Sequence, residues 1–273
     1  MALTNHDASL TPIFIGGAGR SGTTLLRVIL DSHPRISCGP ELKITPVIAQ
    51  LWADFQTKYA PFLKPFLVGP AEIDHLFRVF ISGLLEPFRS HGGKPRVAEK
   101  SPNNVFFFQH LFRIFPQSPF VHIIRDGRDV VASLLQMDWR DMDGKPVPYT
   151  RDPVEAARYW VSAVTAGRSF AAGSTGASRY HEIRYETIVA SPEPVLRLLF
   201  EFLGEAWDAR VLEFHRLPHI LGPESSAAQV SRELFQTAVG RWRNELPDPV
   251  LDAIRPVMGD LLVDLGYAKP GSW

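Results

Sequence analysis

The chain has very little cysteine, with Cys38 alone among its 273 residues. A single thiol excludes an intrachain disulfide and a zinc site built from cysteines, because both need more than one sulfur atom. This cysteine usage is typical of proteins in a reducing compartment. The nine histidines show no H-x-x-x-H or HExxH spacing, so we expect no metal site.

The chain also lacks an excess of either charge, since 29 Lys and Arg residues balance 29 Asp and Glu residues. A protein that coats nucleic acid or an anionic membrane usually carries a strongly basic face. We therefore expect no nucleic-acid partner. An overall balance still permits one basic pocket for a small anionic ligand.

Long apolar runs are missing as well. No uninterrupted stretch approaches the roughly 18 apolar residues of a membrane-spanning helix, and the start, MALTNHDASLTP, lacks the basic and then apolar order of a signal peptide. We expect a cytoplasmic protein without a stable membrane anchor, with residues 1–10 as a flexible tail. Because no repeat or long linker divides the chain, residues 1–273 are predicted to form a single domain.

Short apolar runs alternate with longer segments of helical periodicity. Strands are predicted at 11–16, 96–99, 120–124 and 180–184, and helices at 103–115, 127–136, 153–172, 192–204 and 247–266. Residues 44–88 look mostly helical, and the polar segment 137–151 is predicted to be a surface loop that serves as a lid. This order predicts an α/β fold with three layers, in which a parallel sheet of about four to five strands is flanked by helices.

A glycine-rich loop, GGAGRSGTT, joins the strand predicted at 11–16 to a helix predicted over the next segment, LLRVILDSH. Backbone N–H groups and the positive end of a helix can hold a phosphate there. The loop has Gly17 and Gly22 at the spacing of the nucleotide-triphosphatase P-loop, but Thr23 occupies the place of its lysine. The missing lysine argues against ATP or GTP hydrolysis and favours another phosphorylated donor. Glycine runs also occur in strand-to-helix turns without any ligand.

A second candidate phosphate site follows the strand at 120–124, in the segment IIRDGRDVVAS. Arg125 leaves the strand end, and Ser133 follows two helical turns later. A guanidinium and a hydroxyl at such a junction suit a phosphate monoester. Without the first loop, the same RDGRD segment reads as a solvated turn.

With both loops in this order, the chain resembles the sulfotransferase family, whose donor is 3′-phosphoadenosine 5′-phosphosulfate (PAPS). The stretches GGAGRSGTTLLRVILDSHPRISCGPELKITP, AEKSPN, RYETIV and ESSAAQVSRELFQTAVGRWRNELP are most similar to tyrosylprotein sulfotransferases and their bacterial relatives. The resemblance implies a P-loop-type fold, PAPS as co-substrate without a metal, and a hydroxyl-bearing acceptor of tyrosyl, phenolic, glycan or small-molecule type.

The resemblance also implies roles for single residues. Glu41 is the expected general base, and a carboxylate suits that role when a hydroxyl lies within hydrogen-bond reach. Lys100, Arg20 and Ser226 are expected to stabilise the transition state. The residues expected to contact the donor are Arg20, Ser21, Gly22, Thr23, Thr24, Arg125, Ser133, Tyr185, Ser226, Gln229 and Arg241. From the residues alone, Glu41 is also interpretable as a helix cap or a surface carboxylate, and Lys100 as a surface lysine.

At two positions the chain carries a different cation from the eukaryotic enzymes of that family. Lys43 stands where they carry an arginine near the acceptor, and Arg241 stands where they carry a lysine. Either change keeps the charge but alters the hydrogen-bond geometry. A homodimer is compatible with the resemblance but is not readable from the sequence.

Two other functions remain open from the sequence. One is a small-molecule kinase on the same scaffold, with Asp126 or Asp129 binding Mg²⁺. The other is an inactive module that binds PAPS, against which the joint presence of Glu41, Lys100 and Ser226 argues.

Overall fold

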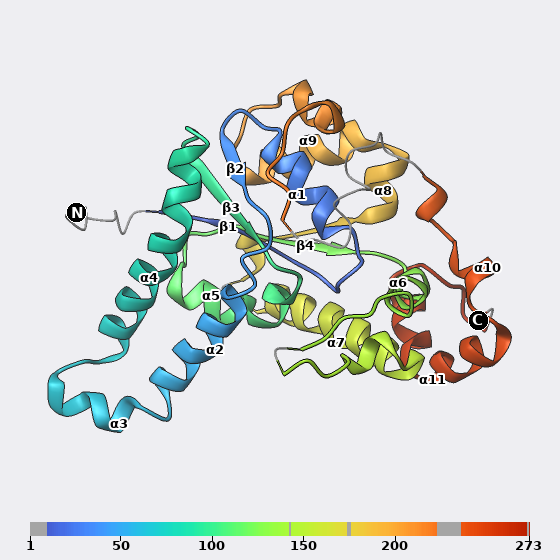
Figure 1. Ribbon diagram of the computed structural model, residues 1–273, viewed down its shortest axis with the longest axis horizontal. Helices are drawn as coiled ribbons and strands as arrows, with labels where there is room; N and C mark the ends of the chain where they lie inside the picture. Colours follow the sequence, from blue (N-terminus) through green and yellow to red (C-terminus); the bar gives the residue numbers. More distant parts are fainter. Residues whose placement is uncertain (1–9, 142, 174–175, 223–235, 272) are drawn as a thin grey trace.

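The computed structural model describes residues 10–141, 143–173, 176–222, 236–271 and 273. Its centre is a parallel sheet with the strand order β2-β3-β1-β4-β5 (Figure 1). The strands are β1 (Ile13–Gly16), β2 (Ile36–Cys38), β3 (Arg96–Lys100), β4 (Phe120–Ile124) and β5 (Tyr180–Arg184). This confirms the predicted α/β fold with a parallel sheet of four to five strands. The predicted tail at 1–10 lies almost wholly outside the described residues.

Both faces of the sheet are buried, as strand β1 shows. Ile13 and Ile15 belong to one hydrophobic cluster, whereas Phe14 between them belongs to another. Successive side chains of a strand point to opposite faces, so a strand of this kind needs a helical layer on each side.

Each face is covered by its own set of helices (Figure 1). The layer on the Phe14 side contains α2 (Thr45–Gln56), α4 (Pro70–His91), α5 (Phe108–Ile114), α6 (Gly127–Leu134), α7 (Pro153–Ala172) and α11 (Asp248–Asp264). The opposite layer contains α1 (Thr23–Asp31), α8 (Tyr185–Ala190), α9 (Pro192–Leu203) and the 3₁₀ segment Ala209–Arg216. Two short helices lie at the periphery, α3 (Ala60–Leu63) between α2 and α4, and α10 (Trp242–Glu245) before α11.

The structure differs from the predicted elements at several places, and the short helices α8 and α10 are among the elements that were not predicted. Strand β2 was not predicted, because it has only three residues and so offers no alternation to detect. The predicted helix 103–115 is a 3₁₀ helix, Pro102–Phe107, followed by α5. The break lies at Phe107, whose backbone angles of φ −119° and ψ 11° are not helical. Of the helices that the structure describes, none is long and apolar enough to cross a membrane.

Candidate active site

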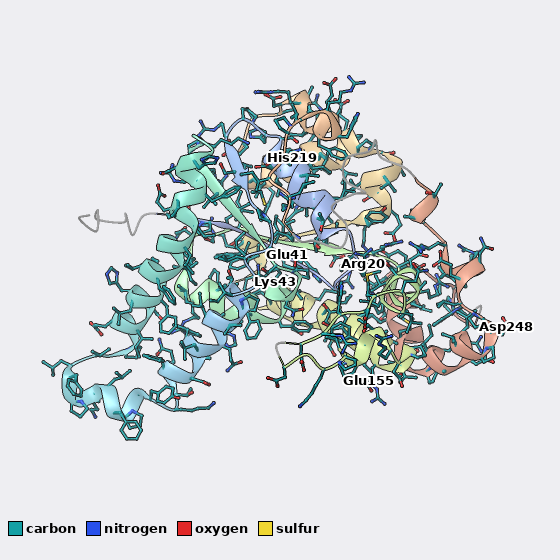
Figure 2. The ribbon with its side chains drawn as sticks, viewed as in Figure 1. Arg20, Glu41, Lys43, Glu155, His219 and Asp248 are labelled. Carbon is teal, nitrogen blue, oxygen red and sulfur yellow. The ribbon has the colours of Figure 1, made fainter. Side chains whose placement is uncertain are left out.

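Three neighbouring strand ends assemble the candidate site. In the order β3-β1-β4, strand β3 ends at Lys100, β1 leads into the glycine loop, and β4 is followed by Arg125. The carboxyl ends of parallel strands share one edge, where open α/β sheets bind ligands. Figure 2 labels Arg20, Glu41 and Lys43 in this central region of the molecule.

The glycine loop packs tightly against strand β4 and the first residue of helix α8. A Cβ atom on Gly17 would lie 2.3 Å from the Ile123 carbonyl oxygen, and one on Gly22 would lie 2.5 Å from the Tyr185 ring. Gly22 has φ 96°, a value that favours glycine. Only glycine at these positions allows the loop this close approach.

The same loop contains a polar group that is buried without a protein partner. Ser21 is fully buried, and its Oγ atom has no hydrogen-bond partner among the residues that the structure describes. Thr23 and Thr24 are also buried, at the start of helix α1. Buried hydroxyls normally find a partner, and a phosphate at this helix N-terminus would supply one.

Arg20 joins the loop to the second predicted phosphate site. Its Nε donates a hydrogen bond to Ser133 Oγ at 3.0 Å, so two residues 113 positions apart in the sequence meet. Burial, and then the charges of Arg125 and Arg241, lower the pKa of the Arg20 guanidinium. Cations crowded in this way favour a multiply charged anion, because its charge offsets their repulsion.

Arg125 contacts the glycine loop. Its Nη1 donates to the Arg20 carbonyl at 3.0 Å, and its guanidinium lies 4.7 Å from the centre of the Tyr185 ring. Its Nε atom is buried and has no partner within the described part of the chain. A phosphate oxygen would satisfy that donor.

The RDGRD segment is buried and not a solvated turn. Asp129 is fully buried and accepts the backbone N–H groups of Gly240 at 2.8 Å and Trp242 at 3.0 Å. These two bonds fix Arg241 between them. Asp126 caps helix α6 by accepting the Arg128 N–H, and its carboxylate also pairs with the Arg128 guanidinium at 2.7 Å. Both carboxylates that were candidate Mg²⁺ ligands therefore already accept hydrogen bonds from protein groups.

Glu41 and Lys100 form a direct pair beside the loop. Lys100 Nζ lies 2.7 Å from Glu41 Oε1 and donates to Thr24 Oγ1 at 3.3 Å. The lysine side chain is fully buried and that of Glu41 is 18% exposed. The structure therefore overturns the surface reading of Lys100. It also overturns the capping reading of Glu41, since helix α2 begins at Thr45 with Ile44 as its N-cap.

The remaining predicted site residues are not part of the Glu41–Lys100 pair or the glycine loop. Lys43 is exposed, and it contacts the site segment through its backbone N–H, which donates to Ser101 Oγ at 3.0 Å. Arg241 donates to Glu245 at 2.7 Å. Ser226 and Gln229 lie outside the described residues.

Sequence reasoning missed the contact between the glycine loop and helix α7. The Gly19 N–H donates to Tyr159 Oη at 2.9 Å, and that hydroxyl donates to Asn103 Oδ1 at 3.1 Å. The Tyr149 ring stacks on Tyr159 at 4.2 Å, and a Cβ on Gly19 would lie 3.3 Å from Trp139. Trp139 and Tyr149 come from the predicted lid loop. Tyr159 carries no motif, so only the fold reveals it.

Comparison with known proteins identifies the family. The profile of the Sulfotransferase family matches residues 12–209. Protein-tyrosine sulfotransferase 2 of Gallus gallus is 31% identical over 272 residues, which cover 96% of this chain and 71% of the relative. Protein-tyrosine sulfotransferase A of Caenorhabditis elegans is 29% identical, with coverage of 94% and 70%.

Solved structures share the fold. The sulfotransferase domain from the curacin biosynthetic pathway superposes with a TM-score of 0.64 at 21% identity, over 92% of this chain and 97% of that one. A mouse sulfotransferase complexed with PAP gives a TM-score of 0.55 at 15% identity, over 95% and 88%. From the family match and the similarity to its relatives, we conclude that the chain belongs to the sulfotransferase family.

Proposed function

We propose that the protein transfers a sulfuryl group from PAPS to a hydroxyl acceptor, with Glu41 as the general base. The observation that carries the proposal is the pair of Lys100 and Glu41, 2.7 Å apart, beside a loop whose buried Ser21 hydroxyl has no partner among the described residues. A buried cation and a partly exposed carboxylate in contact provide a charge stabiliser and a proton acceptor at one place.

The residues at the site fit a donor with phosphates at both ends. The buried Ser21 hydroxyl and the N–H groups at the start of helix α1 suit the 5′-phosphosulfate. The buried Arg125 Nε, with Ser133 and Arg241 nearby, suits the 3′-phosphate. The mouse sulfotransferase complexed with PAP, which has the same fold, supports this choice of donor.

The chain's own groups then have defined tasks. Bound PAPS supplies the sulfuryl group, which moves from the 5′-phosphate to the acceptor oxygen. Glu41 takes the proton of the attacking hydroxyl, so that the new S–O bond forms as the old S–O bond breaks. Lys100 and Arg20 balance the negative charge on the leaving phosphate oxygen and the sulfuryl oxygens, and Ser226 assists Lys100.

Protein tyrosine is one candidate acceptor, because the relatives are named protein-tyrosine sulfotransferases. Phenols, glycans and small alcohols present the same hydroxyl and are candidates on chemical grounds.

Calorimetry separates this function from the kinase alternative. We expect PAP to bind the full chain in the presence of EDTA, because both phosphates are held by protein groups. Preferential binding of ATP with Mg²⁺ would contradict the proposal. Transfer of label from PAPS to phenol would in turn exclude the inactive binding module.

A further inference from the structure

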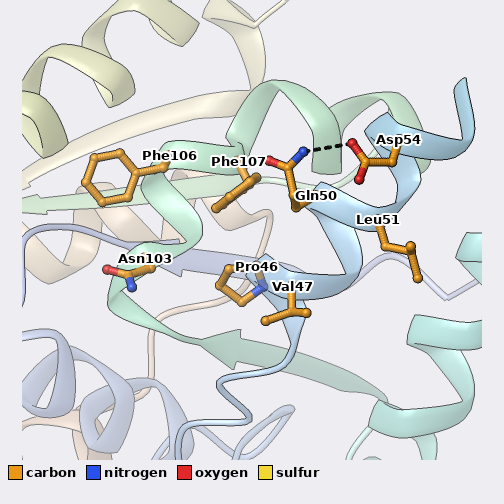
Figure 3. Close-up of a pocket in the computed structure, with 8 residues that line it drawn as sticks. All are labelled: Pro46, Val47, Gln50, Leu51, Asp54, Asn103, Phe106 and Phe107. Carbon is orange, nitrogen blue, oxygen red and sulfur yellow. Dashed lines mark hydrogen bonds between the residues drawn. The ribbon is translucent and has the colours of Figure 1, made fainter. Parts of the chain in front are cut away.

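A groove of about 580 Å³ opens between helix α2 and the 3₁₀ helix Pro102–Phe107 (Figure 3). A volume of this size is typical of sites for small organic ligands. Its lining residues are Pro46, Val47, Gln50, Leu51, Asp54, Asn103, Phe106 and Phe107.

The two walls of the groove continue from the two segments that carry the proposed catalytic pair. Helix α2 begins shortly after Glu41, and the 3₁₀ helix begins shortly after Lys100. The two segments are tied together between these points, where the Lys43 N–H donates to Ser101 Oγ at 3.0 Å. Both walls of the groove therefore lie within a few residues of the proposed catalytic pair along the chain.

The groove is also linked to the glycine loop. Asn103 lines the groove, and its Oδ1 accepts the Tyr159 hydroxyl, which accepts the Gly19 N–H. The Phe106 ring lies 6.0 Å from the Tyr159 ring. One hydrogen-bonded chain thus runs from a residue that lines the groove to the donor loop.

The chemistry of the lining is apolar with almost no charge. Val47 and Leu51 are 59% and 41% exposed, so apolar area remains there for a ligand to cover. Among the described residues that line the groove, Asp54 is the one ionisable group, and it pairs with Lys58 at 2.9 Å. Figure 3 shows its hydrogen bond from Gln50, at 3.3 Å. These described lining residues offer no cation to an acidic acceptor.

From this lining we infer that the groove binds the apolar body of an uncharged aromatic or aliphatic alcohol. The inference rests on the proposed function and narrows its acceptor class. A tyrosyl peptide flanked by carboxylates would find no cation among the described lining residues themselves, and the adjacent Lys58 is already paired with Asp54.

Two changes test the inference: a longer alkyl chain on the phenol acceptor, and a lysine introduced into the groove lining. With labelled PAPS and the full chain, we expect kcat/KM to rise at least tenfold from phenol to 4-hexylphenol, and an acidic tyrosyl peptide to react more slowly than 4-hexylphenol. In Leu51→Lys, the ratio of kcat/KM for 4-hexylphenol to that for phenol should fall at least fivefold. The matched control is Leu198→Lys, on α9 in the opposite helical layer, where the exposed leucine lies away from this groove; it should leave the ratio unchanged.

A binding measurement supplies a readout that is independent of turnover. In calorimetry on the PAP complex, we expect 4-hexylphenol to bind the wild type more tightly than Leu51→Lys, and Leu198→Lys to match the wild type. Transfer to phenol without any gain from the hexyl chain, or with the acidic peptide as the best acceptor, would overturn this inference alone. Absence of transfer to every acceptor would overturn the proposed function and the inference with it.

Discussion

Lys100 Nζ lies 2.7 Å from Glu41 Oε1, and the two partners differ in their access to solvent. The lysine is fully buried, whereas Glu41 is 18% exposed. The carboxylate is therefore the member that an acceptor can reach, and the ammonium is the member that stays fixed. This asymmetry is what a site needs in order to hold one charge in place and exchange a proton at the other.

Replacing Lys100 with Met keeps most of the side-chain volume and removes the charge. We expect kcat to fall by about 10²–10³-fold, in the range seen when one transition-state donor is lost. The measurement is initial-rate transfer from PAPS to phenol, with thermal unfolding as a check on folding. A folded Lys100→Met enzyme with near-normal kcat would remove Lys100 from the mechanism.

Arg125→Lys keeps the positive charge but loses the guanidinium fork. Because Nε of Arg125 is buried without a partner in the described structure, we expect a phosphate to depend on it. The Kd for PAP should rise about 10- to 100-fold, as for a lost charged hydrogen bond. Arg158→Lys on the surface of α7 is the matched control, since that side chain is 63% exposed and pairs with Glu155. Equal PAP affinity in both variants would contradict the assignment.

Gly22→Ala tests the close packing of the donor loop. The new Cβ would meet the Tyr185 ring at 2.5 Å, and the backbone there has φ 96°. We expect a loss of about 1–3 kcal/mol in the free energy of unfolding, together with weaker PAP binding. Gly83→Ala is the control, because its Cβ position in helix α4 has no described atom within 4 Å apart from its chain neighbours and the local helix backbone; that change should add about 1 kcal/mol of stability. Urea titration measures both, and a neutral Gly22→Ala would refute the packing argument.

Asp31 predicts a pH-dependent contribution to stability. Burial raises its pKa, but hydrogen bonds from His219 and the Cys38 N–H, with Lys94 nearby, outweigh burial and hold the pKa below its ordinary value. A carboxylate whose pKa is lowered by folding stabilises the folded state at pH values above its unfolded-state pKa of about 3.9. This stabilisation is lost as the pH falls through the folded-state pKa. Asp31→Asn should therefore be less stable than wild type by about 1–2 kcal/mol at pH 7, and the gap should narrow below pH 4. Urea titrations at both pH values check this, and a gap that is unchanged by pH would contradict it.

Much of the site was predictable because its residues sit at strand ends. Lys100 and Arg125 immediately follow or close short apolar runs, and parallel topology brings such ends to one edge. The glycine loop was predictable for a similar reason, since it joins a strand to a helix. Contacts made by helices far along the chain left no comparable signal. The Tyr159 hydroxyl reaches Gly19 across 140 residues, and neither residue type nor spacing marks that contact.

Burial also changed the interpretation of charged residues. The sequence segment around Asp126 and Asp129 is polar enough to read as solvated, yet these carboxylates are buried because Arg128 and the backbone N–H groups of Gly240 and Trp242 bind them. Segment 240–242 lies more than 100 residues away from Asp129. A partner at such a distance is not visible in local patterning.

Single-turnover transfer from labelled PAPS to phenol, with wild type compared with Glu41→Gln, tests the central claim most directly. Glu193→Gln is the control, an exposed carboxylate on helix α9 that pairs with Arg197. The PAPS concentration is set from the PAP affinity of each variant, so that the same fraction of each enzyme holds the donor. We then predict that Glu41→Gln transfers label about 10²–10⁴-fold more slowly than wild type. Glu193→Gln should keep the wild-type rate. Transfer by Glu41→Gln at the wild-type rate, from a donor bound equally well, would contradict the assignment of Glu41 as the base.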